Sequence, residues 1–147
     1  MTAVNPKARH GARRSSLHAL YQQHITKKPI LDIAAEILAD PHTSMLDVDY
    51  FREITQGAVE RLEILDELIA PVTDRPLNEI SPIELSILRV AVYELKFCLQ
   101  TPYRVIINEA IEIAKKFGAE DSHKYVNGVL DKILPTTRKA EWQNSKS

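Results

Sequence analysis

Residues 81–99 read SPIELSILRVAVYELKFCL and decide the fold. Ser81 and Glu84 have the spacing of a capping box, and Pro82 stands at the first helical position, where proline is favoured. The apolar residues that follow fall on nearly every side of the predicted helix. A helix that is apolar all round is typical of the centre of a bundle. The stretch therefore predicts an all-α fold built around one central helix.

Residues 105–132 read VIINEAIEIAKKFGAEDSHKYVNGVLDK and predict two further helices joined by a tight polar corner. Apolar residues recur at helical spacing on both sides of this corner. Gly118 is expected to end the first helix in left-handed geometry, and Ser122 to cap the second, which Pro135 ends. Burial alone does not require so many polar residues at a helix entrance. The corner therefore indicates a surface that another molecule contacts.

The N-terminal half of the chain adds more helices. Apolar periodicity predicts them over residues 8–25, 29–39 and 47–69. Residues 1–7 are predicted to be disordered because Asn5-Pro6 disfavours helix, and residues 135–147 are predicted to be a flexible polar tail. The result is a single all-α bundle of about seven helices, with one helical domain over residues 8–134.

Composition agrees with one helical domain. The chain has 147 residues, of which only 4 are glycine and 6% are aromatic, and this favours helix over strand. The sequence contains no apolar run of membrane-spanning length and no secretory signal peptide, so the cytoplasm is the expected location. Cys98 is the single cysteine. It cannot form an internal disulfide, and its apolar neighbourhood favours a core thiol over a nucleophile.

The sequence shows no pattern typical of an active site. His18 and His24 are six residues apart, so a helix would not place them on one face to hold a metal. Glu94, Asn108 and Glu109 lie in apolar surroundings, without a nucleophile, a glycine-rich phosphate loop or a set of metal ligands. These three residues are expected to make structural hydrogen bonds between helix ends. We therefore expect no enzyme activity, cofactor or metal.

Charge is unevenly distributed along the chain, although the formal net charge is only −1. Six basic and no acidic residues precede Asp32, whereas the remainder holds 13 basic and 20 acidic residues. This asymmetry favours an anionic partner at the N-terminal end. A basic tail that is merely solvated would give the same pattern, so charge alone leaves both interpretations open.

Four residues form a basic patch at the start of the first predicted helix: Arg9, His10, Arg13 and Arg14. They make two i,i+4 pairs, and like charges at this spacing destabilise a helix by about 0.2–0.5 kcal/mol per pair. An anion lying across the patch would remove this repulsion. RNA phosphates are such anions, and the planar arginine fork binds them well.

Several segments resemble, in the same chain order, the signature of the NusB family. The most specific are Asn108-Glu109-Ala110, Phe117-Gly118 and Lys124-Tyr125-Val126-Asn127-Gly128-Val129-Leu130, and the others are Arg13, Ala19-Leu20-Tyr21, Asp49-Tyr50-Phe51, Leu88-Arg89 and Tyr93-Glu94-Leu95. The resemblance covers about residues 8–134. It implies the helical fold that periodicity also predicts, and a function in transcription antitermination.

The resemblance implies two binding surfaces. The candidate RNA-binding residues are Arg9, His10, Arg13, Arg14, Arg89, Lys124 and Tyr125. The second surface is for NusE, a ribosomal protein, with Tyr21 and Glu84 as its candidates. NusE and this protein together are expected to bind boxA RNA in nascent transcripts, chiefly of ribosomal RNA operons, and to help RNA polymerase pass terminators. His10-Gly11 departs from the continuous arginine that is common in the family.

Most of these assignments have a structural alternative. Tyr125, at the anion-attracting start of its helix, is either a ring that stacks on an RNA base or a core aromatic. Glu84 either contacts NusE or only completes the capping box. Arg89 either contacts RNA or pairs with a glutamate of the bundle. For the whole protein, the alternative is a homodimeric helical scaffold that buries the arginine patch between its two copies.

Overall fold

The structure is a computed structural model that describes residues 4–41, 43 and 45–146. This described part contains eight α-helices and no strand, which confirms the predicted all-α class. The α-helices are α1 (Pro6–Thr26), α2 (Ile30–Ala39), α3 (Val48–Glu60), α4 (Leu62–Ile69), α5 (Pro82–Phe97), α6 (Tyr103–Phe117), α7 (Ser122–Thr137) and α8 (Lys139–Lys146). Two short 3-10 turns, η1 (Ala70–Val72) and η2 (Leu77–Glu79), connect α4 to α5.

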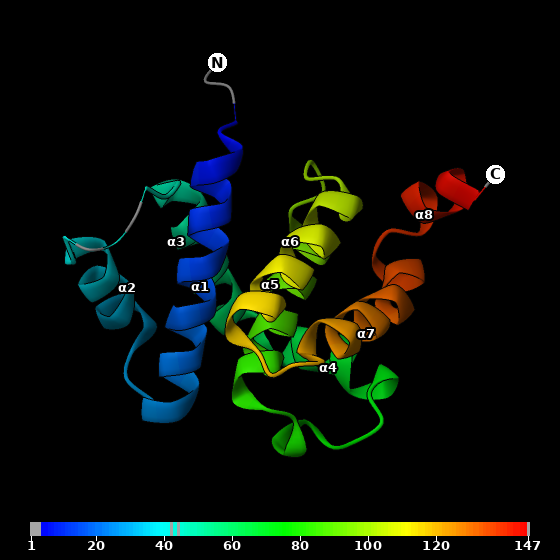
Figure 1. The fold of residues 1–147 in the computed structure, drawn as a ribbon, viewed down its shortest axis with the longest axis horizontal. Helices are drawn as coiled ribbons and strands as arrows, with labels where there is room; N and C mark the ends of the chain where they lie inside the picture. The colour runs from blue at the N-terminus through cyan, green and yellow to red at the C-terminus, as the bar shows by residue number, and fades with distance from the viewer. Residues whose placement is uncertain (1–3, 42, 44, 147) are drawn as a thin grey trace.

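Helix α5 is the centre of the bundle, as its sequence predicts. It packs against α1, α3, α4, α6 and α7, with α1–α3 on one side of it and α7 and α8 on the other (Figure 1). Every residue from Leu85 to Leu95 is buried. Its start also follows the prediction, since the Ser81 hydroxyl accepts a hydrogen bond of 3.4 Å from the backbone N–H of Glu84. The central helix thus packs against helices from both the N-terminal and the C-terminal parts of the chain.

The predicted third helix over residues 47–69 is divided in two. The backbone leaves helical geometry at Arg61, where φ is −113° and ψ is 24°, so that α3 ends and α4 begins. Apolar periodicity does not detect this break, because Phe51 and Ile54 before it are as fully buried as Leu65 after it. The turn at Arg61 allows both segments to pack on α5.

The N-terminal boundary of the fold lies earlier than predicted. Helix α1 begins at Pro6, and the Asn5 side chain accepts hydrogen bonds from the backbone N–H groups of Lys7 (3.0 Å) and Ala8 (3.2 Å). Asn5-Pro6 is thus a helix start, with proline at the position where its missing N–H is not needed. The predicted disorder of residues 1–7 is therefore wrong for Asn5, Pro6 and Lys7. Residues 1–3 lie outside the described residues.

The C-terminal segment is helical where a flexible tail was predicted. Helix α7 continues through Pro135 to Thr137, and α8 follows directly. Arg138, between the two helices, is only 5% exposed. Its guanidinium donates hydrogen bonds to the backbone carbonyls of Glu94, Leu95, Cys98 and Thr101, at 3.2, 2.7, 3.0 and 2.9 Å. These carbonyls lie at and beyond the end of α5, where a helix leaves acceptors without partners, although those of Glu94 and Cys98 also accept hydrogen bonds from the backbone N–H groups of Cys98 and Thr101. Arg138 therefore fixes the end of α7 to the bundle centre.

Candidate nucleic-acid interface

Arg9 is held in a defined position at the start of α1. Its Nε donates a 3.0 Å hydrogen bond to Asp47, and its guanidinium lies 3.8 Å above the centre of the Tyr50 ring. Burial alone would raise the pKa of Asp47, but the Tyr50 N–H and Arg9 outweigh it, and the pKa is lowered. The carboxylate is therefore ionised at neutral pH. Because 24% of the Arg9 side chain is exposed, part of its guanidinium surface faces solvent.

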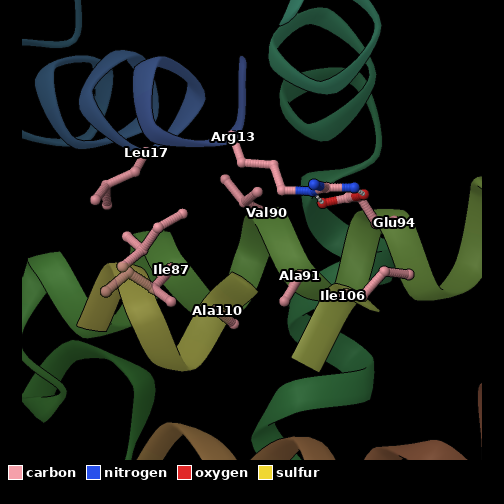
Figure 2. A pocket seen from close by; sticks show the side chains of 9 residues that line it. Arg13, Leu17, Ile87, Val90, Ala91, Glu94, Ile106 and Ala110 are labelled. Atoms are coloured by element: carbon pink, nitrogen blue, oxygen red, sulfur yellow. Dashed lines mark hydrogen bonds and ion pairs between the residues drawn. The ribbon is translucent and has the colours of Figure 1, made fainter. Parts of the chain in front are cut away.

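Arg13 is buried, and this corrects its predicted place in an exposed patch. Figure 2 shows its side chain reaching from α1 to Glu94 of α5. Two hydrogen bonds of 2.7 and 2.9 Å join the guanidinium to this carboxylate, which also accepts one from the Tyr50 hydroxyl. Burial alone would lower the pKa of Arg13, but Glu94 outweighs it and the pKa is raised. Arg13 thus ties α1 to α5 as an ion pair, with a side chain only 4% exposed.

His10 and Arg14 lie on the face of α1 that meets α6. Nδ1 of His10 contacts the carboxylate of Glu109 in α6. Glu109 thus joins two helices as predicted, but from the middle of α6 rather than from a helix end, whereas Asn108 is exposed. Arg14 is half-buried and lines the hollows on either side of it.

Three adjacent hollows follow α1 and form what we call the α1–α6 groove. The first hollow is lined by residues that include Arg9, Pro102, Val105 and Glu109. The second also contains Glu109 and is lined by Lys7, His10 and Arg14. The third also contains Arg14 and is lined by His18, Lys116 and Phe117. The groove is thus lined by five lysine or arginine side chains, of which Arg13 is the buried one, and by two histidines, against Glu109 and Asp40 as acidic lining residues. A positively charged groove with aromatic rings is the arrangement that binds single-stranded nucleic acid.

The corner between α6 and α7 differs in detail from its prediction. Gly118 has φ −89°, so it is not left-handed. Glycine is needed there for space, because a Cβ atom would lie 2.6 Å from the Cβ of Ser122. Ser122 is the first residue of α7 rather than its cap, and its buried hydroxyl accepts a 2.9 Å hydrogen bond from the Ala119 N–H. Lys124 is well exposed, with Nζ 3.5 Å from Asp121.

Tyr125 lies beside residues that the sequence did not connect with it. The guanidinium of Arg75, in the loop between η1 and η2, is 4.7 Å from the centre of its ring. The Tyr125 hydroxyl is buried and has no hydrogen-bond partner in the described structure. Burial is the largest cause that raises the pKa of Tyr125, and the charge of Glu84 adds to it. Tyr125 therefore belongs to a cluster with Arg75 and the partly buried Glu84. Sequence analysis missed Arg75, which has no periodic or capping signal.

Arg89 is part of the bundle. Its side chain is 10% exposed and makes hydrogen bonds of 3.0 and 2.9 Å with Asp66 of α4. The predicted alternative of a structural salt bridge is thus realised, with an aspartate in place of a glutamate. Tyr21 is half-buried on α1. The RNA candidates consequently fall into two groups, surface residues along α1 and α7 and the buried ion-paired Arg13 and Arg89.

Other kinds of site find little support among the described residues. In this part of the chain no group of histidine, cysteine, aspartate or glutamate side chains could hold a metal ion. The helices it contains are all too short or too polar to cross a membrane. Cys98 is buried as predicted, and its thiol donates a 3.2 Å hydrogen bond to Glu53.

The fold and the groove define an all-α bundle with a basic surface groove, and comparison with known proteins identifies its family. The model of the NusB family matches residues 10–135. The transcription antitermination protein NusB of Shewanella amazonensis is 48% identical over 131 residues, or 89% of this chain and 98% of that protein. The protein of the same name from Serratia proteamaculans is 47% identical over 92% of this chain and 99% of its own length. This chain therefore belongs to the NusB family.

Solved structures agree with this assignment. T. maritima NusB matches with a TM-score of 0.82 and 31% identity, over 97% of this chain and 99% of that one. NusB in a crystal structure of the antitermination factors NusB and NusE with double-stranded RNA has a TM-score of 0.75 at 22% identity. That match covers 88% of this chain and 98% of the solved one, and at this identity it supports the fold alone.

Proposed function

We propose that this protein is a non-catalytic transcription antitermination factor of the cytoplasm that binds boxA RNA of nascent transcripts together with NusE. Family membership supports the antitermination role. One solved structure with the same fold contains NusB and NusE in complex with double-stranded RNA. The single observation that carries RNA binding is the basic α1–α6 groove, which contains the surface cations of α1. Its contacts would be chiefly to phosphates, which position a nucleic acid without reading its sequence.

The proposed RNA-binding residues have distinct roles. Arg9, His10 and Arg14 would bind phosphates along α1, and Lys124 would do so at the corner. Because Asp47 takes the Nε–H of Arg9, a phosphate would take the terminal amino groups of that side chain. Tyr125 would offer its ring to a base. The other two candidates, Arg13 and Arg89, would act indirectly through their ion pairs inside the bundle.

Salt dependence of RNA binding tests this proposal. Fluorescence anisotropy of labelled boxA RNA is measured with NusE present at several salt concentrations, for the wild type and a Lys7→Gln, Arg9→Gln variant. Each lost phosphate contact should reduce the slope of log K against log salt by about 0.7. Lys139→Gln is the control, since α8 lies across the molecule from α1 (Figure 1). Equal slopes and affinities for all three proteins would refute the assignment, and a dimer that buried the patch would give this result.

Glu84 and Tyr21 are the proposed NusE contacts. Because the capping bond of α5 uses the backbone N–H of Glu84, Glu84→Gln should leave the cap intact. If the carboxylate binds NusE, calorimetric titration should show a loss of about 1.5–3 kcal/mol in affinity with an unchanged melting temperature. Unchanged affinity would leave Glu84 with a purely structural role.

A further inference from the structure

The third hollow of the α1–α6 groove has a chemistry that phosphate binding does not explain. Its volume is about 430 Å³, within the range of small-ligand sites, and it is lined by Arg14, His18, Gln22, Lys116 and Phe117 among others. The rings of His18 and Phe117 meet edge to face, with centres 4.8 Å apart and planes at 84°. Lys116 brings its ammonium within 5.5 Å of the Phe117 ring centre. Two half-buried aromatic rings therefore stand at the end of a cationic groove.

His18 acts in this hollow as a neutral ring. Burial is the main cause that lowers the pKa of His18 below its ordinary value, and the positive charge of Arg14 lowers it further. At pH 7 the imidazole is therefore chiefly uncharged and adds no cation for a phosphate. The edge-to-face arrangement leaves ring faces that the pair itself does not cover. An uncharged aromatic face between two cations suits a nucleobase whose neighbouring phosphates contact those cations.

The hollow also lies where an RNA strand would reach it. His10 and His18, with Arg14 between them, are eight residues apart along one stripe of α1, about 12 Å by helical rise. This length matches about four stacked nucleotides at about 3.4 Å each. The intervening groove is lined by His10 and Arg14, so a strand would keep cationic contacts along this path.

We propose that His18 and Phe117 form a base-stacking subsite that receives an unpaired nucleotide of the bound RNA. The inference rests on the proposed RNA-binding function and extends it to residues outside the basic patch. Gln22, from the same hollow, offers an amide to the edge of the stacked base. An acidic protein segment is the other class of ligand that the cations would bind, but its carboxylates would not stack on the ring faces.

His18→Ala and His18→Phe test the subsite directly. In the anisotropy assay with NusE and boxA RNA, His18→Ala should bind about tenfold more weakly, as expected for the loss of one stacked base. His18→Phe keeps a ring and should bind within about twofold of the wild type. The salt slope should be unchanged in both, since no charge is lost. The matched control is His24→Ala, a histidine of the same helix that does not line this hollow.

A series of boxA RNAs, each with one abasic nucleotide at a different position, identifies the base that stacks. At one position the abasic RNA should bind the wild type as weakly as intact RNA binds His18→Ala. The same abasic RNA should bind His18→Ala with no further loss of affinity. If His18→Ala and wild type bind intact RNA equally, or if His18→Phe is as weak as His18→Ala, the subsite is refuted. If the wild type itself does not bind RNA, the proposed function fails first and takes the subsite with it. Far-UV circular dichroism confirms that each variant is folded.

Discussion

Replacing Arg13 with methionine tests whether its ion pair holds α1 against α5. Methionine keeps an unbranched apolar side chain but leaves the carboxylate of Glu94, which is 1% exposed, without its guanidinium partner. The Tyr50 hydroxyl would remain as a donor to this carboxylate. Breaking a buried pair by removing one partner costs about 3–5 kcal/mol, far more than an exposed pair. For a chain of this size that loss should lower the melting temperature by about 10–15 °C.

Urea unfolding followed by circular dichroism at 222 nm measures the free energy of unfolding, with the slope m as a check on two-state behaviour. Arg52→Met is the control, because Arg52 of α3 is exposed, and its change should stay within about 0.5 kcal/mol. Combining Arg13→Met with Glu94→Leu should recover most of the loss, since no buried charge is then left alone. A loss below about 1 kcal/mol for Arg13→Met with unchanged m would refute the reasoning.

Further predictions concern packing, the thiol and the tyrosine. Gly57→Ala should destabilise by about 1–3 kcal/mol in urea unfolding, because its Cβ would lie 2.3 Å from the Tyr93 hydroxyl oxygen. Gly128→Ala, with no atom within 4 Å of the new Cβ, should stabilise by about 0.5–1 kcal/mol, and the opposite order would contradict the packing. Burial is the largest cause that raises the pKa of Cys98 to about 12, so iodoacetamide at pH 8 should alkylate only the urea-unfolded chain. Ionisation of this thiol should reduce stability only above about pH 9, where the unfolded thiol loses its proton first. Tyr125→Phe removes a buried hydroxyl that lacks a partner, so its melting temperature should stay level or rise; a fall would show that the hydroxyl is bonded.

Local signals in the sequence predict the central part of the fold well. The start of α5 follows from Ser81 and Pro82, and its central position follows from apolar residues on all sides. Asn5-Pro6 allows two predictions, because proline disfavours helix in the residue before it but favours a helix that begins at the proline. In the structure the helix begins at Pro6. The division at Arg61 leaves no trace in periodicity, because both segments bury apolar residues against α5.

The candidate site was less predictable, because its key pairings join distant positions. Arg13 shares helical spacing with the buried Leu17 and Leu20, which is a signal that could have placed it inside. Its partner Glu94 is 81 positions away, and no local pattern connects the two. The stacking of Arg75 on Tyr125 depends likewise on how a loop folds back onto α7.

Arg138 also fixes the order in which this protein can be completed during synthesis. The ribosome releases the chain from its N-terminus, so α5 emerges long before Arg138. Until then the carbonyls of Leu95 and Thr101 must bond to water, which keeps the end of α5 accessible. The nascent bundle can collapse earlier, but its central helix receives its final hydrogen bonds only when Arg138 arrives. A released chain that ends just before Arg138 should therefore have an incompletely closed bundle that proteases cleave near residues 95–101.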